Sequence, residues 1–318
     1  MSWFTWRLYR NQSALATALL AVLAIVLLIS GLHAAAVWHS ALAQCAKGTC
    51  GGQIGSNLSL SNSAISTLVV ATTAVPLLPG LFWGAPMVAH ELETGTNQFA
   101  WTQSVTRRRW FLVRTGWLLL AAAVTAAAVS ALVTWWSGPS HALQSNAFLA
   151  NRFDVIDIVP VGYAIFAMAL GICAGTLLRR SVPALAVTLA GFVGIRAFVA
   201  QWLRLHYMTP IFVSYKLTSN FTPPRDYLGV SQGILGLNGK PTISNYNLPN
   251  FNGVPIPAGC NPNGSPLTCL AAHGYRGYLT YQPANRFWAF QGIETAIFLA
   301  VAAALLGVTF WILKRRDA

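Results

Sequence analysis

The chain alternates between long apolar runs and short polar breaks. Six runs reach the roughly 20 residues that a helix needs to cross a bilayer, and they span residues 14–38, 64–89, 111–136, 156–178, 182–205 and 287–313. The second run contains Pro76, Pro79 and Pro86. Proline removes a backbone donor, so we expect this helix to be kinked or locally unwound, with neighbouring protein satisfying the freed carbonyl groups. The pattern predicts an all-α polytopic membrane protein with six transmembrane helices.

Composition supports the membrane prediction. Only 8% of the 318 residues are charged and 55% are hydrophobic, whereas a soluble domain carries about 25% charged residues. The formal charge of +13 would suit nucleic acid, but the basic residues lie in short clusters beside the apolar runs, which is typical of membrane orientation. We therefore expect contact with lipid and none with nucleic acid. The first run is too long for a signal peptide and is predicted to be a retained span.

The basic residues predict the orientation. Eleven of the twenty fall on one side of the six spans: Arg7, Arg10, Arg107, Arg108, Arg109, Arg114, Arg179, Arg180, Lys314, Arg315 and Arg316. The short loops of the other side hold Lys47 and Arg152. By the positive-inside rule the first side is cytoplasmic, so both termini are expected inside the plasma (inner) membrane of a bacterium. Residues 1–13 are predicted to form a cytoplasmic interfacial helix or a simple anchor of the first span.

The outer side carries two polar segments. Residues 206–286, between the fifth and sixth helices, are predicted to form a small extracellular domain, and residues 287–318 the sixth helix with a basic cytoplasmic tail. Cys45 and Cys50 lie in the first outer loop, and Cys260 and Cys269 in the second. Four cysteines on the outer side are candidates for disulfide bonds in an oxidising compartment. Their connectivity stays open.

Motifs for catalysis are missing. The stretch "GILGLNGKPT" fails as a P-loop because Pro241 replaces the Ser or Thr that would hold magnesium. The six histidines show no metal-binding spacing. Asp154 and Asp157 stand three residues apart, but their place at a membrane edge favours capping or solvation over acid–base catalysis. We predict no catalytic residues, no metal site, no cofactor in this chain and no enzymatic activity of its own.

Charge concentrates in residues 90–110, "HELETGTNQFAWTQSVTRRRW", a cytoplasmic loop between the second and third spans. Its acidic start and basic end complement a helix dipole, so a short amphipathic helix along the inner membrane face is expected. Such a helix either binds a partner or merely anchors the chain.

The same stretch resembles the loop of type-2 ABC exporter permeases, most closely in the actinobacterial branch, as does the C-terminal "YQPANRFWAFQGIETAIFLAVAAALLGVTFWILKRR". The resemblance implies that residues 90–107 form a coupling helix that docks on a separate ATPase subunit. The residues carried over for this role are Glu91, Glu93, Gly95, Thr96, Trp101, Gln103 and Arg107. The family works as two permeases with two ABC ATPase subunits, which hold the ATP and Mg; the second permease is expected to be an identical copy.

Two charges are predicted inside the membrane. Arg196 lies about 21 Å above the inner end of the fifth span, and Glu294 about 10 Å below the outer end of the sixth, at 1.5 Å per residue. In a core about 30 Å thick these depths nearly coincide. We expect the two charges either to pair structurally or to line one polar pocket on a transport path. Phe82, Trp83 and Phe290 are aromatic candidates for the same path.

The function predicted from these features is the permease subunit of an ATP-binding-cassette exporter that moves a drug, lipid or peptide outward. The alternative is a non-transporting membrane sensor or scaffold whose extracellular domain binds a peptide or a cell-wall component. A membrane-embedded enzyme would need convergent acid, base or metal groups, and Asp154, Asp157 and scattered histidines offer little.

Overall fold

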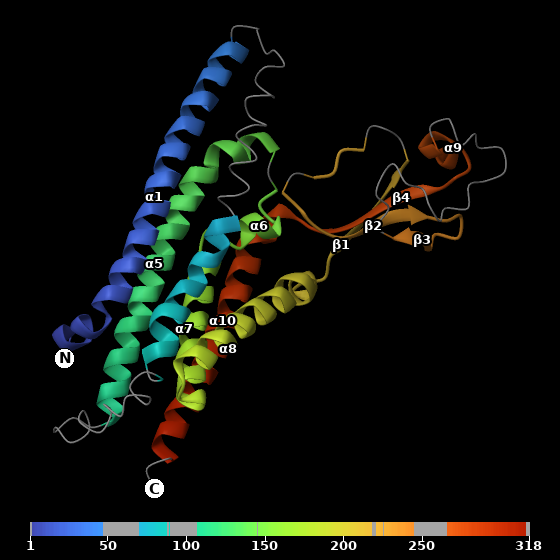
Figure 1. The fold of residues 1–318 in the computed structure, drawn as a ribbon. Coiled ribbons are helices and arrows are strands. Elements are labelled where there is room, and N and C mark those ends of the chain that lie inside the picture. Colours follow the sequence, from blue (N-terminus) through green and yellow to red (C-terminus); the bar gives the residue numbers. More distant parts are fainter. Residues whose placement is uncertain are drawn as a thin grey trace. The chain divides into compact units, whose positions relative to one another are not determined.

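The structure is a computed structural model that describes residues 2–46, 70–87, 89, 107–144, 146–217, 221–224, 226–244 and 266–315 (Figure 1). The chain forms two compact units. The helical unit comprises Met1–Gln144, Ala150–Gln201 and Ala289–Ala318, and the sheet unit comprises Ser145–Leu149 and Trp202–Trp288.

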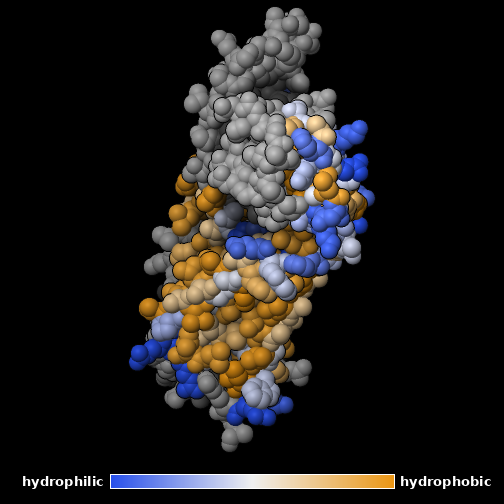
Figure 2. Space-filling model, turned by 90° about the vertical axis from the view of Figure 1, so that its right-hand side faces the viewer, coloured by the Kyte–Doolittle hydropathy of each residue, from blue (hydrophilic) through white to orange (hydrophobic). Residues whose placement is uncertain are grey.

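Long apolar helices make up the helical unit. They are α1 (Ser2–Ala46), an irregular helix over Val70–Met87, α5 (Arg107–Gln144), α7 (Val159–Leu178), α8 (Ser181–Phe198) and α10 (Phe287–Arg315), with a short α6 (Ala150–Phe153) before α7. Hydrophobic residues cover much of their visible surface in Figure 2. This arrangement fits a polytopic membrane protein.

Five helices among the described residues are long and apolar enough to cross a membrane: Val70–Met87, Phe111–Gly138, Val159–Leu178, Ser181–His206 and Ala284–Arg315. Each overlaps one of the predicted spans 64–89, 111–136, 156–178, 182–205 and 287–313. The first predicted span, 14–38, lies in α1, where the apolar stretch Thr17–His33 is shorter. Residues 2–13, predicted as an interfacial helix, belong to the same continuous α1.

The centre of the helical unit is α7, which is buried over most of its length and contacts α5, α8 and the irregular helix. Its Ala164, Met168 and Ile172 form a hydrophobic cluster with Met87 of the irregular helix and Phe111 of α5. Such a helix, apolar on all sides, is suited to a position surrounded by other helices.

The helix over Val70–Met87 is interrupted twice, which confirms the effect predicted from its prolines. A 3₁₀ turn, η1 (Val75–Leu77), carries Pro76, and a π-helical turn, η2 (Gly80–Gly84), follows Pro79. Both changes alter the spacing of backbone hydrogen bonds where a proline N–H is missing.

Four glycines bring this irregular helix into backbone contact with α7. Gly80 and Gly84 face α7, and Gly171 and Gly175 of α7 face the irregular helix. A Cβ atom added at Gly80 would lie 2.3 Å from the carbonyl oxygen of Ala167, and one at Gly171 would lie 2.5 Å from the carbonyl oxygen of Gly80. Each helix therefore carries a G-x-x-x-G pair of the kind that lets membrane helices approach closely.

The sheet unit corrects the all-α prediction. Residues 206–286, predicted as a small extracellular domain without assigned strands, contain a four-stranded antiparallel sheet in the order β1-β4-β2-β3. The strands are β1 (Ile211–Lys216), β2 (Leu228–Leu235), β3 (Pro241–Ser244) and β4 (Arg276–Gln282).

A small core holds the sheet together. The helix α9 (Pro266–Ala272) places Leu270 against Ile234 of β2 and against Leu217. The turn between β2 and β3 closes through a hydrogen bond from the Gly236 N–H to the Lys240 carbonyl (2.9 Å), and Gly239 adopts a positive φ of 71° there. A left-handed turn residue is most easily supplied by glycine.

Candidate functional site

A buried ion pair occupies the interior of the helical unit. Arg196 of α8 places its Nη2 3.1 Å from Oδ2 of Asp154, and both side chains are at most 14% exposed. The Arg196 guanidinium also lies over the Tyr163 ring, 4.8 Å from its centroid. The cation is thus neutralised by a carboxylate and stabilised by an aromatic face.

The same guanidinium supports the interrupted helix. Nη1 of Arg196 donates a 2.7 Å hydrogen bond to the carbonyl oxygen of Thr73, just before η1. In 3₁₀ spacing this carbonyl would accept from residue 76, and Pro76 has no N–H. Arg196 therefore supplies a donor where the proline removes one, as the sequence analysis required of a neighbouring segment.

Tyr163 of α7 connects this ion pair to α10. Its hydroxyl donates to Oε1 of the fully buried Glu294 and lies 3.4 Å from Oδ1 of Asp154. Arg196 and Glu294, which the sequence placed at one depth, are thus linked through Tyr163, while the carboxylate that contacts Arg196 directly is Asp154. One cation and two carboxyl groups share the cluster.

Aromatic rings enclose the cluster on the side of α7, α8 and α10. The Tyr163 ring stands edge-on to Phe298, with centroids 4.7 Å apart, and to Phe192 at 6.3 Å. Phe166 contacts Phe192 and Phe298 in turn. These rings exclude water, and electrostatic interactions strengthen in such a low-dielectric surrounding.

The segment between α6 and α7 is held by side chains from two helices. Gln291 of α10 accepts from the Val159 N–H (3.0 Å) and donates to the Phe153 carbonyl (3.1 Å). Ser130 of α5 donates to the Asp157 carbonyl at 2.7 Å. These hydrogen bonds fix the backbone on both sides of Asp154, so its carboxylate is positioned by a scaffold of three elements.

Asp157 occupies a strained position in this segment. Its φ is 59°, in the left-handed region that Asp and Asn tolerate better than most residues. Burial raises the pKa of its carboxyl group above the ordinary value of 3.8, and the nearby Arg152 acts in the opposite direction. Asp157 is therefore a titratable group whose ionisation costs free energy in the folded chain.

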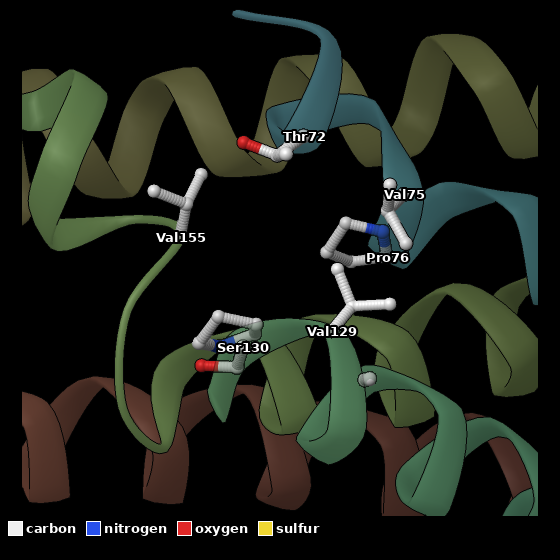
Figure 3. Close-up of a pocket in the computed structure, with 8 residues that line it drawn as sticks. Thr72, Val75, Pro76, Val129, Ser130 and Val155 are labelled. Carbon is white, nitrogen blue, oxygen red and sulfur yellow. The ribbon is translucent and has the colours of Figure 1, made fainter. Parts of the chain in front are cut away.

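A small pocket borders the cluster (Figure 3). Its lining comes from the irregular helix, α5 and the segment before α7, and includes Thr72, Pro76, Ser130 and Val155. Thr72 and Val155 are the sequence neighbours of Thr73 and Asp154. The space holds little more than one water molecule, so the pocket in this conformation is too small for a drug or lipid.

Most predicted coupling residues lie outside the described residues. These are Glu91, Glu93, Gly95, Thr96, Trp101 and Gln103, and Arg107 begins α5 without a described side chain. Of the path candidates, Phe82 and Trp83 are half-buried in η2, where Trp83 packs against the α7 cluster, and Phe290 is fully buried. None of these three lines the pocket of Figure 3.

The predicted disulfide residues are described only in part. Cys269, in α9, is disulfide-bonded. The side chain of Cys45 and the whole of Cys50 and Cys260 lie outside the described residues, so both pairings stay predictions. Cys173 is a free, buried thiol in α7.

Sequence reasoning missed three members of the cluster. Asp154 was expected at a membrane edge and is instead buried beside Arg196, while Tyr163 and Gln291 were not singled out. A signal for Gln291 was available, because it stands three residues before Glu294 and so shares its helix face. No comparable spacing connects Asp154 to α8, since that contact is formed only by the fold.

Comparison with known families decides the classification. A family model described as ABC-2 membrane transporter related matches residues 17–204, more than half of the chain. The chain belongs to this family. The matched range of this ABC-2-related protein includes Arg196, Asp154 and the glycine contacts, and it ends before the first strand of the sheet. Searches of curated proteins and of solved structures found no match.

Family membership supports a multi-pass membrane protein that serves as the membrane subunit of a transporter. It also implies partnership with an ABC ATPase. The cluster around Arg196 and the glycine contacts are accordingly features of a transporter membrane subunit.

Proposed function

We propose that this ABC-2-related chain is the permease subunit of an exporter that moves a hydrophobic or amphipathic substrate, such as a drug, lipid or peptide, outward. The family match over residues 17–204 carries the proposal. The five apolar helices of the described chain support it, since they offer membrane-spanning length. An actinobacterial type-2 exporter remains the nearest resemblance in the sequence.

The energy comes from a separate ATPase subunit that docks on residues 90–107 and holds ATP and Mg. This loop joins the irregular helix Val70–Met87 to α5. A push on the loop acts directly on the helix that packs against α7 through its glycines. Two ATPase subunits and a second, identical permease would complete the complex.

The cytoplasmic side is assigned to the basic ends of the helices. Arg179 and Arg180 lie exposed between α7 and α8, and Lys314 and Arg315 lie exposed at the end of α10. This placement supports cytoplasmic termini and an extracellular sheet unit in a bacterial plasma membrane.

The cluster around Arg196 has two possible roles in this function. It either holds α8 and α10 to α7 or opens into a polar part of the substrate path. Exchanging the charges of Arg196 and Asp154 separates the roles. Recovered folding with lost transport favours the path, whereas recovery of both favours a structural pair.

The proposal is tested with the chain and its ATPase reconstituted in inside-out vesicles. ATP-dependent uptake of a lipophilic fluorescent dye, with ATP turnover raised by the dye, is the expected result. The double variant Glu91→Ala/Glu93→Ala should lose the bound ATPase, while Arg179→Gln, an exposed change on the same side, should keep it. An ATPase whose turnover no hydrophobic compound alters, together with absent uptake, would overturn export and favour the sensor or scaffold.

A further inference from the structure

The sheet unit carries an unbalanced positive charge. Residues 202–288 hold six Lys and Arg residues and one acidic residue, Asp226, giving a net charge of +5 with neutral histidines. Asp226 lies before β2, and its Oδ1 accepts a hydrogen bond from the Ala147 N–H at 3.0 Å. The single carboxylate of the unit is therefore already engaged in holding the chain.

Three of the cations line one end of the sheet. Lys216 ends β1 directly opposite Arg276, which begins β4. Leu235 of β2 is also opposite Arg276, and Pro241 of β3 is opposite Leu235, with Lys240 immediately before it. We call Lys216, Arg276 and Lys240 the basic edge; all three are exposed.

The basic edge is electrostatically unfavourable by itself. Like charges directly opposite each other on neighbouring strands destabilise a sheet. Within the described part of the chain, neither Lys216 nor Arg276 has an ion-pair partner. Elsewhere in the chain, Asp154 and Glu294 are buried in the helical unit. The charge that would offset the basic edge must come from another molecule.

We propose that the basic edge binds an extended polyanion with repeating phosphate groups. Strands in a sheet lie about 4.8 Å apart, so Lys216 in β1 and Lys240 before β3 are separated by three such intervals, about 14 Å. A single phosphate is too small to contact all three cations, whereas a chain of phosphates laid across the strand ends meets each in turn. Arg276, in the middle, offers a planar fork suited to phosphate oxygens.

The position of the basic edge favours a polymer over a membrane surface. The chain enters the sheet at Ile211 and leaves it at Gln282, and these residues share the opposite end of β1 and β4. At about 3.3 Å per residue, six residues of strand put the basic edge about 20 Å along the sheet from those junctions. A ligand free to extend beyond the lipid headgroups fits this position.

The test uses the full chain in nanodiscs of zwitterionic lipid and a fluorescent long-chain inorganic polyphosphate, followed by anisotropy. The triple variant Lys216→Gln/Lys240→Gln/Arg276→Gln should bind at least tenfold more weakly. The slope of log affinity against log salt should fall by about 2, since each lost phosphate contact contributes about 0.7. The matched control is Arg179→Gln/Arg180→Gln/Arg315→Gln, which removes three exposed cations from the helical unit and should bind within about twofold of wild type.

A further variant separates binding from folding. Arg276→Glu replaces the like-charge pair with an opposite-charge pair, so the melting temperature should hold or rise while polyphosphate binding falls. Equal losses in the two triple variants would show non-specific attraction and overturn the proposal. So would displacement by orthophosphate at equal phosphate concentration, which indicates a single-anion site. Loss of binding to phosphatidylglycerol vesicles with unchanged polyphosphate binding would assign the surface to the membrane instead.

Discussion

Adding one methyl group at Gly171 tests the contact between the irregular helix Val70–Met87 and α7. The new Cβ of Gly171→Ala would lie 2.5 Å from the Gly80 carbonyl oxygen and 2.8 Å from the Ala85 nitrogen. Both are backbone atoms, so no side-chain rotation relieves the clash. The oxygen would have to retreat by 0.9 Å to reach the 3.4 Å at which ordinary contact begins.

Two effects of opposite sign set the magnitude. Alanine is favoured over glycine inside a helix by about 0.5–1 kcal/mol. Forcing an extra methyl group into a close-packed interior costs about 1–3 kcal/mol. Because the clash is with backbone, the second effect should win, and we expect a net loss of roughly 0.5–2 kcal/mol in the free energy of unfolding.

Thermal unfolding of the purified chain, followed by tryptophan fluorescence, measures this difference. Gly194→Ala in α8 and Gly307→Ala in α10 are matched controls, since a Cβ at either position meets nothing within 4 Å. The controls should melt at or above the wild-type temperature, and Gly171→Ala should melt about 2–6 °C below it. A Gly171→Ala protein as stable as Gly194→Ala would show that the two helices are not held in backbone contact.

Three further predictions concern the buried cluster and the segment before α7, each read by the melting temperature of the purified chain. Arg196→Met leaves Asp154 buried without its cation and should cost about 3–5 kcal/mol; adding Asp154→Asn should recover part of the loss, and no recovery would contradict the ion pair. Tyr163→Phe removes the hydroxyl that contacts two carboxyl groups and should cost about 1–3 kcal/mol, so an unchanged melting temperature would count against this bridge. Burial raises the pKa of Asp157 above 3.8, so its ionisation weakens the folded state as pH rises past that value. Asp157→Asn, which also suits the positive φ, should therefore gain stability over wild type at about pH 7 and not at about pH 3; an advantage independent of pH would argue against burial as the cause.

Hydropathy and proline placement predicted the helical unit well, because both act within a single helix. A run such as 182–205 must be helical in lipid to satisfy its own backbone, and the structure has a helix at Ser181–His206. Pro76 interrupts its helix for an equally local reason. The glycine contacts needed more, since G-x-x-x-G at Gly80 and at Gly171 does not say which helices meet.

The sheet unit and the cluster were harder to predict because their determinants are not local. Strand β1 is exposed on both faces over much of its length, so it lacks the alternation of apolar and polar residues that marks a half-buried strand. Strand preference depends on neighbouring strands, and β4 pairs with β1 across sixty intervening residues. In the cluster, the depths of Arg196 and Glu294 followed from helix rise, while Asp154 entered through a turn whose path the sequence does not encode locally.

The irregular helix is tied to its neighbours at two levels, which limits how it can move. At Thr73 its carbonyl accepts from Arg196 of α8, and that guanidinium is itself paired with Asp154 before α7. One to three turns further on, Gly80 and Gly84 lie against the α7 backbone. A displacement of this helix alone would break a buried charge-assisted hydrogen bond and open a backbone contact, both costly in a dry interior. A joint displacement with α7 and α8 breaks neither, so these three helices are expected to move as one body in any conformational change of the helical unit.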